Sequence, residues 1–358
     1  MKSGQSRRFL GAFCVILAAS LAACGADDGA TPPDAAVADA AVPTADADPN
    51  LISSRGLYAD ISTHTVYDFA VEYTPLYTLW ADDAGKRRWI KLPLGSQIDT
   101  SNMDHWVFPV GTQLWKEFAT PGGQLLETRL IEKQADGTYF FGTFVWDADG
   151  KDARLTPNGA NNILGTQHDV PSKARCLLCH KGEDGRVLGF SALQLSKDDE
   201  SHGPTLKTLA ANGLLSDPPP AGTDFRFPGD DKTKAALGYL HANCGHCHTP
   251  TGTAYGDTCK QGSDPPTDCM QLQFSVADAN AQDPLQSAVV TSLLGHLTNS
   301  NSFEGDPRLT PGHPEMSAIY VRPSQRGGTV QMPPAFSTEV VDDVGLAAIE
   351  AWIDGLPQ

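Results

Sequence analysis

Positively charged residues are scarce in this sequence of 358 residues. Lysine and arginine together number 26, against 43 aspartates and glutamates, so the formal net charge is -17. Proteins that bind nucleic acid carry a basic patch for the phosphate backbone, and this composition therefore argues against a nucleic-acid partner. The acidic excess keeps the surface solvated, and an acidic face can also steer a basic partner protein.

A hydrophobic run long enough to span a membrane is missing at the N-terminus, although a short one is present. The apolar stretch Phe9–Ser20 falls short of the about 20 apolar residues that a transmembrane helix needs. It leads into small residues and Cys24, a pattern that resembles a lipoprotein signal. We predict a lipoprotein signal peptide over residues 1–23 and a lipid on Cys24 that anchors the exported protein to a membrane, on the periplasmic or outer-membrane side.

Aromatic residues are absent from the segment that follows. Residues 24–50 consist mostly of alanine, aspartate, proline and threonine. Such a segment cannot bury enough apolar surface to offset the entropy lost on ordering, so we expect a disordered acidic tether. About 310 residues remain after it, enough for two or three hydrophobic cores.

Two C-x-x-C-H pentads carry the chemistry of the chain, and they comprise Cys176, Cys179 and His180, then Cys244, Cys247 and His248. Two thiols one helical turn apart can each bond a vinyl group of one porphyrin, and the adjacent histidine then binds the iron. We therefore predict two covalently bound haems c. A structural C-x-x-C disulfide is the plainer alternative. A four-cysteine zinc site fits poorly, because its pairs usually lie about 15–20 residues apart.

Two cysteines remain once the pentads, the signal peptide and Cys24 are counted. These are Cys259 and Cys269, which flank a short loop that contains two prolines. In the oxidising compartment of an exported protein we expect them to form a disulfide. Closing a loop of this size is worth roughly 2–3 kcal/mol in the chain-entropy model.

The segment 51–170 has the pattern of a β domain. Strands are expected over Arg87–Leu92 and His105–Phe118, and a hairpin is expected to turn at Asp136-Gly137. Pro109 and Gly111 indicate an edge or a bulge in the second strand. Five tryptophans fall in this segment, and core packing explains them better than a sugar-binding platform. We expect a β-sandwich-like domain.

Helical signals take over from Asp169 onward. Ser172, Asp230 and Asp342 are each placed to cap a helix that follows. The first of these helices carries the first pentad within a haem-binding region over 171–228, and the others belong to a cytochrome c-like domain over 229–358. The predicted fold class is α+β, with an N-terminal β-sandwich-like domain followed by mostly α-helical cytochrome c-like haem domains.

Methionine is scarce, which limits the choice of distal haem ligands. After the signal only Met103, Met270, Met316 and Met332 remain. Met332 stands in a Met-Pro-Pro turn and is the predicted distal ligand of the second haem, with Met316 and Met270 as alternatives. For the first haem the candidates are His168, His105, His202 or an open position. His246 and His313 are expected to be exposed or to face a propionate.

Motifs along nearly the whole chain after the tether resemble a family of secreted bacterial dihaem c-type cytochromes. The resemblance rests on segments 170–180 and 239–248, on Phe108–Thr112 with Lys116–Phe118, on Glu127–Arg129, and on Pro311–Ser317 through Met332–Pro334. It implies electron carriage, and some relatives are joined to modules with the character of quinone-dependent sugar dehydrogenases. The tether and the Cys259–Cys269 segment depart from the family pattern.

Two functions follow from how the first haem is coordinated. If both irons are saturated, the protein is an electron-transfer protein that passes electrons to a redox partner protein, for example from a quinone-dependent dehydrogenase to a respiratory acceptor. An open first haem instead permits the chemistry of a dihaem peroxidase-like enzyme, because the distal pocket decides between binding and activation. The shuttle is the favoured function, and the residues identify no catalytic group outside the haem sites.

Overall fold

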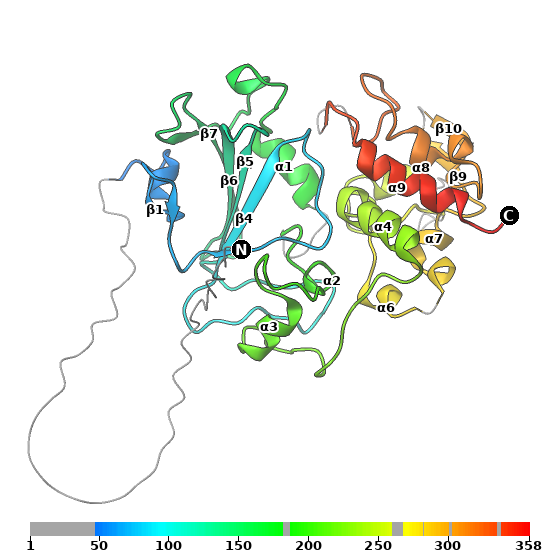
Figure 1. Ribbon diagram of the computed structural model, residues 1–358, viewed down its shortest axis with the longest axis horizontal. Helices are drawn as coiled ribbons and strands as arrows, with labels where there is room; N and C mark the ends of the chain where they lie inside the picture. The colour runs from blue at the N-terminus through cyan, green and yellow to red at the C-terminus, as the bar shows by residue number, and fades with distance from the viewer. Residues whose placement is uncertain (1–46, 182–186, 260–267, 282, 301–302, 335–337) are drawn as a thin grey trace, which may run out of the picture. The chain divides into compact units, whose positions relative to one another are not determined.

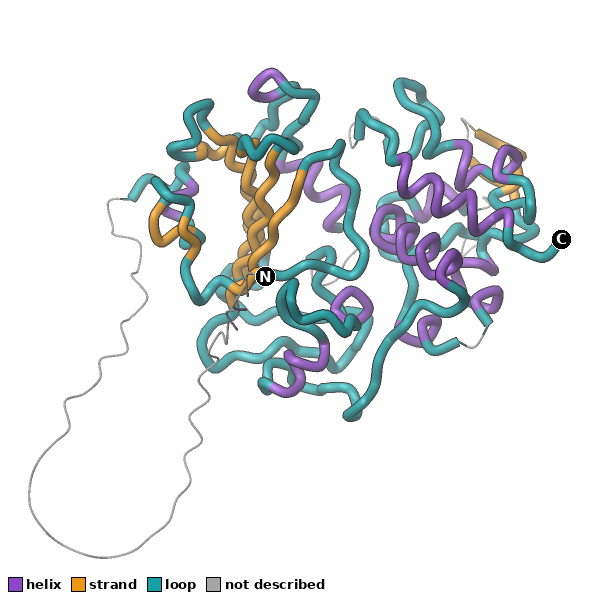
Figure 2. The backbone as a smooth tube through the Cα atoms, in the orientation of Figure 1, coloured by secondary structure: helices purple, strands orange, loops and turns teal. Residues whose placement is uncertain are grey.

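A meander of antiparallel strands forms the N-terminal part of the computed structural model, which describes residues 47–181, 187–259, 268–281, 283–300, 303–334 and 338–358. Consecutive strands are hydrogen-bonded neighbours in one six-stranded sheet (Figures 1 and 2). Its strands are β3 (Val71–Glu72), β4 (Gly85–Lys91), β5 (Gln113–Ala119), β6 (Leu125–Lys133), β7 (Tyr139–Trp146) and β8 (Ala153–Leu155). Short ribbons are formed by β1 (Tyr58–Asp60) with β2 (Thr65–Val66) and by β9 (Leu297–Ser300) with β10 (Phe303–Pro307).

The two faces of the sheet differ in character, because side chains alternate along each strand. One face packs Trp89, Trp115 and Trp146 into a buried cluster with Phe144. Trp106 is also buried, in the larger core, and Trp80 is partly exposed. The prediction that the tryptophans pack in a core is confirmed for the four that are buried.

The register of the sheet sets a row of polar residues across its other face. Arg88 pairs with Lys116, Lys116 with Arg129, and Arg129 with Thr143 on four successive strands. The row above it is apolar and consists of Ile90, Leu114, Ile131 and Phe141. Three cations are thus placed side by side next to the apolar row, and Lys86 and Glu127 lie on the same face.

The predicted hairpin at Asp136-Gly137 is confirmed and joins β6 to β7. Gly137 has a φ of +82°, which favours glycine, and the side chain of Asp136 accepts hydrogen bonds from Thr138. The strand predicted over His105–Phe118 is shorter than expected and begins at Gln113. Gly111 has a φ of +87° and Thr112 donates to the carbonyl of Pro109, so the preceding residues form a turn instead.

The helices are short, and the predicted caps begin three of them. Ser172, Asp230 and Asp342 each accept a backbone hydrogen bond in the first turn, which confirms these N-caps. The helices are α1 (Lys173–His180), α2 (Ala192–Leu195), α3 (Leu206–Ala211), α4 (Asp231–Leu240), α5 (Tyr255–Thr258), α6 (Val276–Ala279), α7 (Ala288–Thr291), α8 (Ala318–Val321) and α9 (Asp343–Asp354). A π-helical turn, His241–Gly245, continues α4. Short 3₁₀ turns are Ile52–Ser54, Ile163–Gly165, Pro284–Gln286 and Pro314–Met316.

The predicted fold class is wrong in its parts, although the chain is α+β overall. The expected β-sandwich is a single six-stranded antiparallel sheet, whose second face is covered by α1 and loops rather than by another sheet (Figure 1). The expected mostly α-helical cytochrome domains are not formed either. In the described residues after the sheet, the longest helix has 12 residues and most have four. With 34 glycines and 26 prolines in the chain, helices are interrupted before they lengthen.

One large hydrophobic cluster connects the sheet to the helices. It contains Ile90 and Leu114 of the sheet together with Leu195, Leu237 and Ile353 from the segments that follow. Residues 47–358 form one compact unit, and this cluster crosses the predicted boundaries at 170 and 228. No helix in the described ranges combines the length and the hydrophobicity of a membrane span. The predicted signal peptide, Cys24 and residues 25–46 of the tether lie outside the described residues.

Candidate functional site

The first pentad lies on α1, which packs against β7. The hydroxyl of Thr143 forms a hydrogen bond with the thiol of Cys176. The ring of His180 contacts Phe141 at a centroid distance of 5.2 Å. Leu177 and Leu178, between the two cysteines, are each 38% exposed. The helix therefore turns its thiols and its histidine toward the sheet and leaves the intervening leucines outside.

The second pentad begins in the π-helical turn at the end of α4. The backbone N–H groups of Cys247 and His248 both donate to the carbonyl of Cys244, at 3.1 and 3.0 Å. Gly245 permits this turn to approach the next segment, because a Cβ there would lie 2.9 Å from the Cα of Gln273. The imidazole of His248 is buried, and its Nδ1 has no hydrogen-bond partner among the described residues. Burial, with a smaller effect from Arg322, lowers the pKa of His248 to about 4, so the ring is neutral and suited to binding a metal.

The structure brings the two pentads together, although they are far apart in the sequence. One ligand atom each from Cys179, His246 and Cys247 lies within 4.8 Å of the others. The hydroxyl of Thr253 donates to the carbonyl of Leu178 at 3.1 Å and so links the two segments. A hydrogen bond from Cys179, helped by His246, holds the pKa of Cys247 below its usual range, while the pKa of Cys179 is raised.

A cavity of about 140 Å³ opens between α1 and the sheet. Cys176, Cys179 and His180 all line it, together with Leu114, Ile131 and Phe141 of the apolar row. A second cavity of about 60 Å³ shares the residues Leu79, Lys116, Val187, Leu188 and His246 with the first. The first pentad therefore faces an enclosed space, and Lys116 and His246 stand where the two spaces adjoin.

Cations line the sheet side of this cavity. Lys86 donates to the carbonyl of Leu79, and burial, followed by the charges of Arg88 and Arg129, lowers the pKa of Lys86 to about 7. The amine of Lys116 has no hydrogen-bond or ion-pair partner in the described part of the chain. Burial and the same two arginines hold the pKa of Lys116 well below its usual range. Sequence reasoning gave these residues no role, because their shared face follows only from the strand register.

His168 belongs to a buried ion-pair network on the wall of the cavity. Its Nε2 lies 2.7 Å from a carboxylate oxygen of Glu127, which is fully buried and also binds the guanidinium of Arg129. Arg129 stacks over Phe118 at 4.5 Å from the ring centroid. Burial opposes ionisation of Glu127, but Arg129 and His168 nevertheless keep its pKa below the usual value.

No protein-family model, curated protein or solved structure matches this chain. What the site can do must therefore be derived from its own residues. Two sets of paired thiols with an adjacent imidazole, one facing a cavity and the other buried, form the most specific donor arrangement that the structure describes.

Two of the three histidines predicted as distal ligands of the first haem do not line the cavity beside the first pentad. His202 is 69% exposed in its side chain and lies 3.8 Å from the carboxylate of Asp199. His105 does not line the cavity, although His168 does. His313 is half-exposed, as expected, and lies 3.1 Å from Glu315. His246 was expected to be exposed or to face a propionate, and it is buried.

The methionines differ in how far they are available as ligands. Met332 is partly buried, and its N–H donates to the carbonyl of Arg322, whose charge lies close enough to His248 to lower the pKa of that ring. Met316 is 53% exposed, which suits a buried iron poorly. Met270 and Met103 pack against the large hydrophobic cluster.

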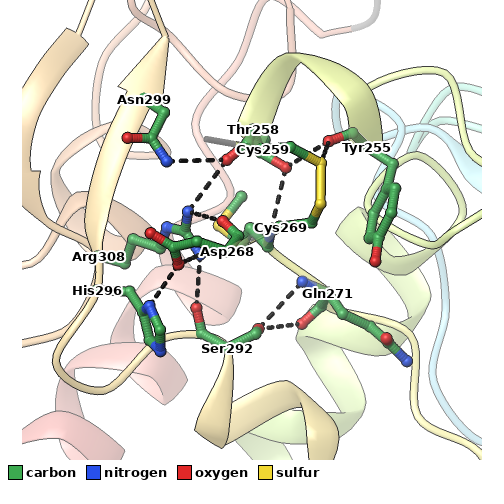
Figure 3. Close-up of a disulfide and its surroundings, with 11 residues drawn as sticks. Tyr255, Thr258, Cys259, Asp268, Cys269, Gln271, Ser292, His296, Asn299 and Arg308 are labelled. Atoms are coloured by element: carbon green, nitrogen blue, oxygen red, sulfur yellow. Dashed lines mark hydrogen bonds and ion pairs between the residues drawn. A yellow bond between two sulfur atoms is a disulfide. The ribbon is translucent and has the colours of Figure 1, made fainter. Parts of the chain in front are cut away.

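The disulfide between Cys259 and Cys269 adjoins a buried arginine (Figure 3). Arg308 is 1% exposed and donates to the carbonyls of Ser292, Leu297, Thr258 and Asp268 at 2.6–3.1 Å. Its guanidinium also lies 3.5 Å from the carboxylate of Asp268. Arg308 joins the disulfide segment to β9, a role that no motif in the sequence signalled.

Proposed function

We propose that this chain is a dihaem c-type cytochrome that carries electrons, is exported, and is held at a membrane by lipid on Cys24. The observation that carries the proposal is the convergence of two C-x-x-C-H segments on one site, with Cys179 and Cys247 in the same cluster within 4.8 Å. Groups attached to neighbouring sulfurs are close enough to exchange electrons without a large motion of the protein. The resemblance to secreted dihaem cytochromes supports the same function.

The residues fit haem c. Cys176 and Cys179 would bond one porphyrin and Cys244 and Cys247 the other, with His180 and His248 as iron ligands. The cavity beside His180 leaves room for a bound group next to the thiols of the first pentad. Bound haem supplies one-electron iron chemistry, and Met332 is the proposed distal ligand of the second iron.

The acidic surface suits a basic redox partner. Opposite charges steer the encounter of two proteins and raise its rate at low salt. A net charge of -17 would therefore favour a positively charged electron donor or acceptor over an acidic one. The resemblance suggests a quinone-dependent dehydrogenase as a donor and a respiratory protein as an acceptor.

The pyridine haemochrome assay tests the proposal, because it counts haem against protein. We expect two haems per full-length chain expressed with a cytochrome c maturation system. The double variant Cys176→Ala, Cys179→Ala should hold one haem, while Cys259→Ala with Cys269→Ala should keep two. One haem or none in the unmutated chain would contradict the dihaem function.

A soft metal ion is the second candidate, and one specific observation favours it. Cys179, His246 and Cys247 offer two sulfurs and a nitrogen within 4.8 Å, a donor set that suits Zn²⁺. If the chain carries no haem, elemental analysis of the purified protein should show one zinc per chain that His246→Ala removes. Two covalent haems would exclude this site, because both of its sulfurs would be in thioether bonds.

A further inference from the structure

The side chains that line the cavity beside the first pentad are the candidates for the sixth iron ligand of the first haem. This inference rests on the proposed function. Cys176, Cys179 and His180 occupy one wall of that cavity. The sheet contributes Lys116, Arg129 and Thr143 of its polar row to the same cavity. None of the described residues that line the cavity is a methionine, so the nitrogen donors on its wall are the next candidates for a sixth ligand.

Three nitrogen donors on the cavity wall are poor candidates, because two already form hydrogen bonds and the third belongs to the second pentad. The Nε2 of His168 is held by Glu127 at 2.7 Å. Lys86 donates to the carbonyl of Leu79. His246 stands between the cysteines of the second pentad, in the cluster with Cys247.

Lys116 is the lining residue that meets every requirement. It lies in the middle of β5, on the face that α1 covers, so a rigid strand positions it. It lines both cavities, and its amine has no hydrogen-bond or ion-pair partner among the described residues. The neighbouring positive charges of Arg88 and Arg129 oppose protonation, and an amine must be neutral to offer its lone pair to iron.

We infer that the amine of Lys116 is the sixth ligand of the haem iron bound by His180. On binding, the amine nitrogen forms a coordinate bond to iron and any ammonium proton leaves to solvent. The first haem would then be saturated by histidine and lysine. This favours the electron-transfer function over peroxide chemistry, which needs an open position.

Two substitutions of Lys116 in the full-length dihaem protein separate ligation from charge. Lys116→Gln removes both the donor and the charge, whereas Lys116→Arg keeps a cation that does not bind iron. We expect both variants to retain two haems and to convert about half of the ferric iron from low spin to high spin, as measured by EPR. His168→Gln should leave the spin state unchanged.

The opposite results would overturn the inference without touching the dihaem function. One such result is two haems per chain with all iron low-spin in both Lys116 variants. Another is conversion of ferric iron to high spin by His168→Gln and by neither Lys116 variant. If only Lys116→Gln has an effect and Lys116→Arg does not, the residue acts as a cation, for example on a propionate, and is no ligand. A chain without haem would instead contradict the proposed function itself.

A measurement on the unmutated protein keeps the test independent of folding in the variants. Protein labelled with ¹⁵N-lysine should show hyperfine coupling from one ¹⁵N nucleus to a low-spin ferric iron in pulsed EPR. Absence of that coupling, or a high-spin first haem in the unmutated chain, would overturn lysine ligation.

Discussion

At the scale of single residues, Arg308 and Glu127 are buried charges that are surrounded by their partners. Arg308 satisfies four backbone carbonyls around the Cys259–Cys269 segment (Figure 3). Glu127 is fully buried between Arg129 and His168. Lys116, on the cavity wall, is half-buried and its amine has no hydrogen-bond or ion-pair partner among the described residues, so it is available to a group bound in the cavity.

Replacing Arg308 should be strongly destabilising. Arg308→Leu leaves the four carbonyls without their donor and Asp268 without its cation, and each orphaned buried group costs about 1–3 kcal/mol. We expect the free energy of unfolding to fall by about 3 kcal/mol or more, measured by urea denaturation. Arg154→Leu is the matched control, because Arg154 is exposed and its contact with Asp48 is 3.7 Å long, so its effect should stay within about 0.5 kcal/mol. Equal effects in the two variants would contradict this role of Arg308.

At the scale of elements, a helix and the turn after it position the second pentad. The carboxylate of Asp230 accepts hydrogen bonds from the N–H and the hydroxyl of Thr233 and so begins α4. Gly238 and Gly345 lie where a side chain would collide with Tyr77 and Tyr239, so α4 packs closely on its neighbours, including α9. The π-helical turn then follows directly and carries Cys244.

Removing the cap should make the protein less stable in a pH-dependent way. The hydrogen bond from the side chain of Thr233, and then that from its backbone, lowers the pKa of Asp230. A carboxyl whose pKa is lower in the folded state stabilises it above the unfolded pKa of about 3.9, and loses this effect as pH falls through the folded pKa. Asp230→Ala should therefore lower Tm by about 2–4 °C at pH 7.

The change in Tm at acidic pH is the part of that experiment that tests the role of the carboxylate charge. Thermal unfolding followed from pH 7 to pH 2.5 should show the Tm difference between Asp230→Ala and the unmutated protein narrowing below about pH 4. Asp230→Asn, which caps without titrating, should remain close to the unmutated protein at pH 7. A Tm difference that does not change with pH would show that the carboxylate charge plays no part.

At the scale of the whole molecule, one hydrophobic cluster unites the sheet with the helices that carry the second pentad. The residue contacts between the pentads and the shared walls of the two cavities are therefore held by a common core. We expect the two proposed haems to keep a fixed position relative to each other. We also expect the segment before residue 47 to let the protein extend away from the membrane.

The membrane anchor can be tested by one substitution. Cys24→Ser should prevent lipid attachment, and the protein should shift from the membrane fraction to the soluble periplasmic fraction on immunoblots. Cys14→Ser, in the predicted signal peptide, is the control and should leave the protein in the membrane fraction. Retention of Cys24→Ser on the membrane would rule out this anchor.

Local features of the fold were predictable from the sequence because they depend on neighbouring residues. The hairpin at Asp136-Gly137 and the caps at Ser172, Asp230 and Asp342 follow from backbone conformation and side-chain hydrogen bonds within a few positions. The strand placed over His105–Phe118 was too long, because the turn around Pro109 and Gly111 removed its first half.

The sequence by itself therefore determined the two pentads, the spacing of their thiols and histidines, and the paired cysteines at 259 and 269. Only the tertiary structure decided that the β region is a single sheet, that Cys179 lies beside Cys247, and that Lys116 faces the cavity of the first pentad. The physical reason is the separation along the sequence of the residues that specify each feature. A pentad is written in five consecutive residues, whereas the row of Arg88, Lys116 and Arg129 exists only after strand register and long-range packing have placed separate segments side by side.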